Sequence, residues 1–148
     1  MKNIPFFILL ADDDPDDRLL FTKGFSELKI KTVVYTVNDG IELMEFLTRK
    51  GGPLPKIIFL DLNMPRKNGL ECLIEIKSNK KLKDIVIAIY STSSSEKNIE
   101  ETFQFGANIY IQKPADFKIL KKVLDQAVMT SWHYQDPPFN KANFLLRI

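Results

Sequence analysis

Five short stretches of the chain are apolar at nearly every position and rich in branched and aromatic residues. They are Phe6–Ala11, Thr32–Val37, Ile57–Leu60, Ile85–Tyr90 and Ile109–Gln112. Strands covered by helices on both faces have this composition, whereas strands with one solvated face alternate between apolar and polar residues. The pattern therefore predicts five buried strands.

A segment with helical spacing of its apolar residues follows each of these strands. The predicted helices cover about Pro15–Leu28, about Asp39–Arg49, a segment that opens at Asn68-Gly69, a segment from near Ser95 to Gly106, and about Ala115–Trp132. Strand followed by helix, five times over, is typical of an α/β protein in which a parallel sheet carries helices on both faces.

Acidic residues are concentrated directly after the first strand. Asp14 precedes a proline and is predicted to cap the following helix. Asp16 and Asp17 fall in the first turn of that helix, where negative charge interacts favourably with the helix dipole. These three acids are assigned to the helix, whereas Asp12 and Asp13 precede the cap and need another explanation.

The 148 residues are enough for one domain with a sizeable core. The strand and helix pattern ends at Trp132 and breaks at Asp136-Pro137-Pro138. We expect one domain over residues 3–133 and a tail over residues 134–148, with no separate output domain. The tail is predicted to dock on its own domain or on a second copy, which would give a homodimer. Its apolar residues are Phe139, Phe144, Leu145, Leu146 and Ile148.

The net charge of +2 is too small to predict a nucleic-acid or membrane partner. Cys72 is the only cysteine, which excludes a disulfide framework and a multi-thiolate zinc site and fits a reducing compartment. The apolar run Ile4–Ala11 is far shorter than the ~18 residues that span a bilayer, and no cleavage site follows it. The chain is therefore expected to be cytoplasmic.

Polar side chains follow the predicted strands at the points where the strands end. Asp12 and Asp13 follow the first strand, Asp61 the third, Ser91 the fourth and Lys113 the fifth. In an open parallel sheet the carboxyl ends of the strands share one edge, and ligands bind there. Three carboxylates at one edge repel one another unless a proton or a cation intervenes, and oxygen-only ligands suit Mg²⁺. Lys113 is expected to pair with a carboxylate or with a bound phosphoryl group.

Four sequence blocks around these residues resemble the receiver domain of two-component response regulators. They are ILLADDD at 8–14, IIFLDLNMPRKNGLE at 57–71, IAIYSTS at 87–93 and GANIYIQKP at 106–114. The resemblance extends over Asn3–Trp132 and implies a flavodoxin-like (βα)5 fold, a doubly wound parallel sheet with strand order 2-1-3-4-5.

The resemblance implies that Asp61 is the phosphoacceptor and takes a phosphoryl group from a sensor histidine kinase or a phosphotransfer protein. Asp12 and Asp13 would hold Mg²⁺, with Asp13 and Asp61 as direct ligands and Asp12 acting mainly through water. The main-chain carbonyl of Asn63 would complete the protein ligands. Lys113 would contact the phosphoryl oxygens.

Four further assignments rest on the same resemblance. Ser91 would donate a hydrogen bond to the phosphoryl group, and it is a mild departure from the threonine that is common there. Tyr110 occupies the aromatic switch position of the family and would turn inward as Ser91 moves. The side chains of Asn63 and Ser93 occupy positions that tune the rate of dephosphorylation.

The function implied is a stand-alone receiver that catalyses only its own phosphorylation and dephosphorylation and switches its binding to a separate downstream protein. A relay role, in which the phosphoryl group is handed on, is equally compatible with the sequence. One alternative is a receiver-like binding module that works without phosphorylation. Another is a haloacid-dehalogenase-like phosphatase with Asp12 as nucleophile and Asp14 as second acid, although that reading leaves the Asp61 motif unexplained.

Overall fold

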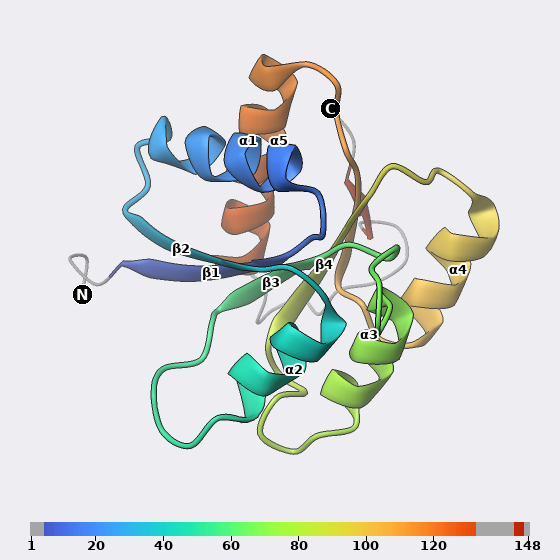
Figure 1. Ribbon diagram of the computed structural model, residues 1–148. Coiled ribbons are helices and arrows are strands. Elements are labelled where there is room, and N and C mark those ends of the chain that lie inside the picture. The colour runs from blue at the N-terminus through green and yellow to red at the C-terminus, as the bar shows by residue number, and fades with distance from the viewer. Residues whose placement is uncertain (1–4, 133–143, 147–148) are drawn as a thin grey trace.

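The computed structural model describes residues 5–132 and 144–146 (Figure 1). Six parallel strands form one sheet in the order β2-β1-β3-β4-β5-β6. The strands are β1 (Phe6–Ala11), β2 (Thr32–Val37), β3 (Ile57–Leu60), β4 (Val86–Ser91), β5 (Ile109–Gln112) and β6 (Leu145–Leu146). The predicted order of the first five strands is confirmed, and β4 begins and ends one residue later than expected.

Helices cover both faces of the sheet. They are α1 (Pro15–Ser26), α2 (Gly40–Thr48), α3 (Gly69–Lys77), α4 (Glu96–Gln104) and α5 (Phe117–Trp132). Figure 1 shows α1 and α5 together on one face and α2 and α3 on the other. The predicted doubly wound α/β fold is therefore confirmed.

Two hydrophobic cores lie on opposite faces of the sheet, and β1 contributes to both. Ile8 and Leu10 pack into the core under α1 and α5, while Leu9 and Ala11 pack into the core under α2 and α3. All four side chains are fully buried, which is why this strand is apolar at successive positions rather than at alternate ones. Each large side chain buried in this way contributes about 2 kcal/mol to folding.

Four helices begin at a polar residue whose side chain accepts a hydrogen bond from the first turn. Asp14, Asp39, Asn68 and Ser95 cap α1, α2, α3 and α4, respectively. Asn68 also forms a reciprocal capping box with Glu71. Each cap sets the residue at which the loop after a strand ends and the next helix begins. The caps therefore define the ends of the loops that carry the polar side chains.

The short strand β6 lies beside β5 at the edge of the sheet. Leu145 pairs with Tyr110, and the Tyr110 amide donates a 2.8 Å hydrogen bond to the carbonyl of Phe144. Phe144 is fully buried, with its ring 5.1 Å from that of Phe103 and 6.0 Å from that of Tyr110. Residues 144–146 of the tail therefore dock on their own domain. The predicted boundary between domain and tail, at 133/134, lies outside the described residues.

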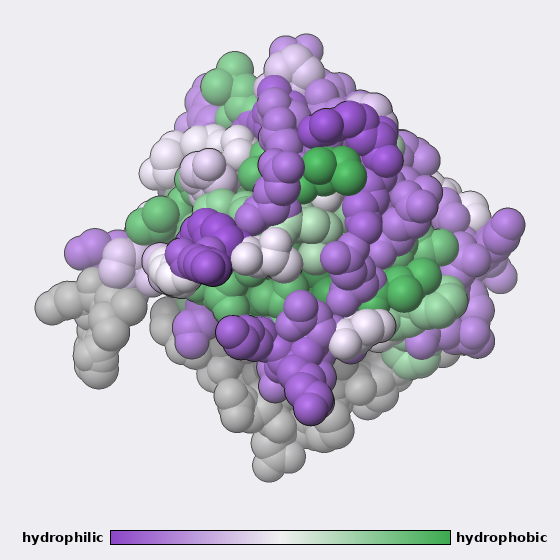
Figure 2. Space-filling model, turned by 60° about the horizontal axis from the view of Figure 1, so that its bottom comes forward, coloured by the Kyte–Doolittle hydropathy of each residue, from purple (hydrophilic) through white to green (hydrophobic). Residues whose placement is uncertain are grey.

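The surface seen in Figure 2 is mostly hydrophilic, with hydrophobic side chains in small groups between polar ones. Within residues 5–132 and 144–146, no helix is both long enough and apolar enough to cross a membrane. Cys72 is buried in α3, and burial raises the pKa of its thiol to about 12.

Candidate functional site

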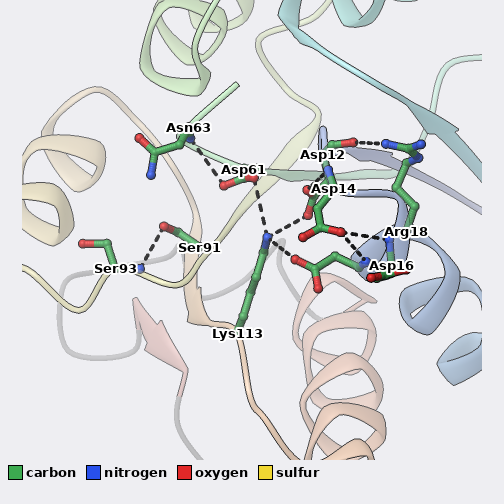
Figure 3. A network of polar contacts seen from close by, with 10 residues as sticks. Asp12, Asp14, Asp16, Arg18, Asp61, Asn63, Ser91, Ser93 and Lys113 are labelled. Atoms are coloured by element: carbon green, nitrogen blue, oxygen red, sulfur yellow. Dashed lines mark hydrogen bonds and ion pairs between the residues drawn. The ribbon is translucent and has the colours of Figure 1, made fainter. Parts of the chain in front are cut away.

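Hydrogen bonds between neighbouring strands extend past the strand ends and align the residues that follow. The Asp61 amide donates to the carbonyl of Ala11 at 3.0 Å, and the Lys113 amide donates to the carbonyl of Ser91 at 2.8 Å. Asp12 directly follows β1. Because the strands are parallel, these residues come together at one edge of the sheet, as Figure 3 shows.

Three carboxylates meet at this edge. Asp12, Asp13 and Asp61 each place one carboxylate oxygen within 4.8 Å of the others. Asp12 is fully buried, the Asp61 side chain is 9% exposed and Asp13 is exposed. Oδ1 of Asp12 accepts a hydrogen bond from the Asp14 amide, whereas the buried Oδ2 accepts none from the described residues and faces the Lys113 ammonium. This donor set consists of hard oxygen ligands and suits a divalent cation such as Mg²⁺.

The ammonium of Lys113 reaches into the carboxylate cluster and is surrounded by three acids. Nζ lies 2.8 Å from Oδ2 of Asp12, 2.9 Å from Oδ2 of Asp17 and 3.5 Å from Oδ2 of Asp61. Asp17 comes from the first turn of α1, one turn away from the strand end. The assignment of Asp17 to the helix dipole alone is therefore wrong, because its carboxylate also pairs with Lys113.

Burial and charge act against each other at this cluster. Burial raises the pKa of Asp61 to about 7; the Lys113 ammonium opposes this shift and the Asp12 carboxylate adds to it. Burial alone would lower the pKa of Lys113, but its contacts with the acids more than offset that effect and hold the pKa above its ordinary value. The lysine is therefore charged at neutral pH, whereas Asp61, when no cation is bound, ionises at a higher pH than an ordinary aspartate.

The loop after β3 is held tightly against the site. A Cβ added to Gly69 would lie 2.2 Å from the main-chain oxygen of Asp61, so only glycine fits there. Arg66 adopts a positive φ of 67° and its guanidinium makes two hydrogen bonds, of 2.9 and 3.2 Å, with the carboxylate of Asp39. This pair ties the loop to the start of α2, which offsets the strain of the left-handed backbone. The Asn63 side chain is exposed, and the main-chain N–H of Asn63 donates a 3.4 Å hydrogen bond to Oδ1 of Asp61.

The end of β4 and the loop after it carry the two predicted serines. Ser91 is fully buried, and its Oγ accepts a 3.1 Å hydrogen bond from the Ser93 amide. Oγ of Ser93 accepts hydrogen bonds from the Ser95 amide and from Nδ2 of Asn98, so this side chain is engaged with the start of α4. Tyr110 is fully buried, and its hydroxyl donates a 2.9 Å hydrogen bond to the Ser93 carbonyl. The ring of Tyr110 is thus in the inward orientation.

Asp14 is directed to its own helix rather than to the cluster. Its Oδ1 accepts hydrogen bonds from the amides of Asp16 and Asp17, as the predicted cap requires. A phosphatase that used Asp12 as nucleophile would need Asp14 free to act as an acid. The geometry gives that alternative no support.

The chain is similar to known proteins over most of its length. The model of the response regulator receiver domain family matches residues 8–125. Response regulator Rcp1 from Synechocystis sp. is 34% identical over 135 residues, which cover 88% of this chain and 91% of that protein. The chain belongs to the response regulator receiver domain family.

Two solved structures show the same fold at significant identity. The phosphorylated cyanobacterial phytochrome response regulator RcpA superposes with a TM-score of 0.81 at 32% identity, over 88% of this chain and 96% of that one. The Mn²⁺-bound form of response regulator Rcp1 superposes with a TM-score of 0.76 at 31% identity, over 92% of this chain and 99% of that one. Receiver domains are signalling modules that accept a phosphoryl group from histidine kinases and bind a divalent metal at an acidic pocket.

The cluster brings together Asp12, Asp13, Asp61 and Lys113, all of which were predicted from the sequence. The contact of Asp17 with Lys113 was not predicted from the sequence. The spacing of apolar residues places Asp17 on a helix, but it does not show which strand end that helix lies against. Its position on the same turn as the cap was the available signal.

Proposed function

We propose that the protein is a stand-alone response regulator receiver that accepts a phosphoryl group on Asp61 from a sensor histidine kinase or a phosphotransfer protein. The reaction depends on Mg²⁺, and phosphorylation changes the affinity of the domain for a downstream protein. The observation that carries this proposal is the convergence of a buried lysine ammonium and three carboxylates at the carboxyl end of the sheet. The domain over residues 3–133 performs this reaction, in the cytoplasm.

Asp12, Asp13 and Asp61 would hold the metal, with Asp13 and Asp61 as direct ligands and Asp12 acting mainly through water. The main-chain carbonyl of Asn63 is the fourth proposed protein ligand. A bound Mg²⁺ supplies positive charge that neutralises the transferring phosphoryl oxygens. Among the described residues, the buried Oδ2 of Asp12 accepts no hydrogen bond and faces the Lys113 ammonium at 2.8 Å, and three carboxylates share this one ammonium; the excess of negative charge supports a cation at this position.

In the transfer step, a carboxylate oxygen of Asp61 attacks the phosphorus atom of a phosphohistidine. The P–N bond breaks, and its electron pair stays on the imidazole nitrogen, which remains in the donor protein and takes up a proton. A P–O bond to Asp61 forms, giving an acyl phosphate. Lys113 balances the charge of the phosphoryl oxygens, and the Ser91 hydroxyl donates a hydrogen bond to one of them.

The output of this reaction is a change in the loop after β4. When the Ser91 hydroxyl turns to the phosphoryl group, it gives up the hydrogen bond that it accepts from the Ser93 amide. The Tyr110 ring already points inward while Ser91 bonds to Ser93, so the expected inward turn does not accompany a movement of Ser91 here; a change in the loop would instead alter the hydrogen bond from the Tyr110 hydroxyl to the Ser93 carbonyl. An acyl phosphate brings up to two negative charges, enough to bias a loop between two arrangements. The side chains of Asn63 and Ser93 then tune how fast the phosphoryl group is lost.

Intact-mass spectrometry with Mg²⁺ and a small acyl-phosphate donor tests the proposal. The wild-type protein is expected to gain a single phosphoryl group, and the adduct should disappear in Asp61→Asn and in a chelator. Asp125→Asn, an exposed acid on α5, is the matched control and should leave the adduct unchanged. An adduct that survives Asp61→Asn would contradict the proposed nucleophile. No adduct from this donor or from a phosphohistidine donor would favour a binding module that works without phosphorylation.

A further inference from the structure

Lys113 is held farther from the proposed phosphoacceptor than from two other acids. Its Nζ lies 3.5 Å from Oδ2 of Asp61, compared with 2.8 Å for Asp12 and 2.9 Å for Asp17. An ammonium group has three N–H donors, and three carboxylates already surround it. A phosphoryl oxygen on Asp61 can take the place of the Asp61 carboxylate oxygen, but it draws the ammonium nearer than the present 3.5 Å only by weakening the contact with Asp12 or with Asp17.

The two near partners differ in how easily they can be exchanged. Asp12 is fully buried, and Oδ2 has no other partner among the described residues, so separating it from the ammonium would leave a bare charge inside the protein. The Asp17 side chain is 31% exposed, and water can solvate its carboxylate after the ion pair breaks. Asp17 is therefore the partner that can release the ammonium at low cost.

We propose that Asp17 is a positioning residue that holds the Lys113 ammonium toward α1 and competes with the phosphoryl group for it. The proposal rests on the function proposed above for Asp61 and Lys113. In the unphosphorylated domain, Asp17 pulls the ammonium away from Asp61. In the phosphorylated domain, a phosphoryl oxygen takes the place of Asp17, whose carboxylate turns to solvent. Asp17 therefore sets how tightly the site retains a phosphoryl group.

Beryllofluoride tests this competition, because it mimics a phosphoryl group on a carboxylate without a covalent transfer step. The experiment measures, by ¹⁹F NMR in the presence of saturating Mg²⁺, the concentration that half-saturates the protein. Asp17→Asn keeps the shape of the side chain and removes its charge. We expect half-saturation at about one third of the wild-type concentration, the effect of removing one partly exposed ion pair.

Asp16→Asn is the matched control. Asp16 is an exposed acid one residue earlier in the same helical turn, and Lys113 forms ion pairs with Asp12, Asp17 and Asp61 instead. This variant removes the same charge and should change half-saturation much less than Asp17→Asn. A third comparison measures the effect of Asp17→Asn in a protein that already carries Lys113→Gln. In that background Asp17→Asn should no longer lower the half-saturating concentration, because the ammonium is absent. If Lys113→Gln does not fold or bind, the comparison of Asp17→Asn with Asp16→Asn decides.

The outcomes separate the two proposals. If the wild-type protein binds no beryllofluoride at Asp61, the proposed function fails and this inference fails with it. If the wild type binds it but Asp17→Asn weakens binding or matches Asp16→Asn, the proposed function stands and the competition by Asp17 is overturned. An effect of Asp17→Asn that persists in the Lys113→Gln background would also overturn it, since the effect would then not act through the lysine.

Discussion

The hydroxyl of Tyr110 donates a 2.9 Å hydrogen bond to the main-chain carbonyl of Ser93. This contact joins β5 to the loop between β4 and α4, the loop that carries Ser91 at its base. Ser93 in turn accepts hydrogen bonds from the Ser95 amide and from Asn98 in α4. The strand end, the loop and the helix therefore form one connected unit next to the carboxylate cluster.

Removing the Tyr110 hydroxyl should loosen this loop. Tyr110→Phe is expected to lower the free energy of unfolding by about 1 kcal/mol, the net value of one hydrogen bond, and to speed amide exchange at Ser93 and Ser95. Hydrogen-exchange mass spectrometry measures the second effect. Tyr35→Phe is the control, because Tyr35 lies half exposed on β2, and it should leave exchange in the loop unchanged. Unchanged exchange in Tyr110→Phe would show that the hydroxyl does not hold the loop.

Phe144 should anchor the C-terminal strand through its buried ring. Phe144→Ala removes the contacts with Phe103 and Tyr110 and is expected to cost about 3 kcal/mol of stability in chemical denaturation. Phe105→Ala provides a matched control because that ring is 44% exposed, and it should cost less than about 1 kcal/mol. Equal losses in the two variants would argue against docking of residues 144–146 on their own domain.

The raised pKa of Asp61 predicts a pH dependence of stability in chelator. The ordinary pKa of the carboxyl is 3.8 and its folded value is about 7, so between these values the folded state binds more protons than the unfolded state. Ionised Asp61 therefore destabilises the fold as pH rises from about 4 to about 7. The shift of about three pKa units, at about 1.4 kcal/mol each, means that Asp61→Asn should be more stable than wild type by up to about 4 kcal/mol at pH 8, and the difference should shrink toward zero near pH 4.

Urea denaturation of both proteins at several pH values in chelator measures this difference. Adding Mg²⁺ at pH 8 should stabilise the wild type more than Asp61→Asn, because the cation binds the ionised carboxylate. A difference that is constant from pH 4 to pH 8 would show that Asp61 has an ordinary pKa in the fold.

Gly69 should be irreplaceable for steric reasons. In Gly69→Ala the added methyl group would meet the Asp61 carbonyl oxygen at 2.2 Å and Cα of Leu62 at 2.8 Å, so the loop must move. We expect a loss of about 2 kcal/mol in stability and weaker Mg²⁺ binding by calorimetry. In Gly24→Ala the methyl group meets only flexible side chains, Leu124 closest at 3.0 Å, and Mg²⁺ binding should not change. Wild-type Mg²⁺ binding in Gly69→Ala would mean that the loop does not set the site.

The strands and most of the site follow from local patterns in the sequence. A strand covered on both faces is apolar throughout, so β1, β3 and β5 were predicted with their observed bounds. The bounds of β2 were also predicted, but the expectation that it is buried is wrong, because β2 lies at the edge of the sheet and leaves Val33 and Tyr35 half exposed. Asp12, Asp61 and Lys113 were found because each directly follows a strand, and strand ends of a parallel sheet share one edge.

Two features depend on packing that local patterns do not encode. Asp17 faces Lys113 across 96 positions of sequence, and only the packing of α1 against α5, the helix that follows Lys113, brings the two side chains together. Strand β6 has two residues, too few to show a period, and it exists because the free edge of β5 offers hydrogen-bonding groups to the Phe144 segment. The apolar composition of the tail predicted docking but not its form as a strand.

Locating the modified residue shows whether Asp61 forms the acyl phosphate. The protein is phosphorylated with Mg²⁺ and an acyl-phosphate donor, treated with borohydride, which reduces an aspartyl phosphate to homoserine, and then digested for peptide sequencing by mass spectrometry. We predict homoserine at position 61, lost when chelator is present during phosphorylation. Homoserine at position 12 or 13 instead, or at no position in a protein that carries a phosphoryl group, would contradict this account.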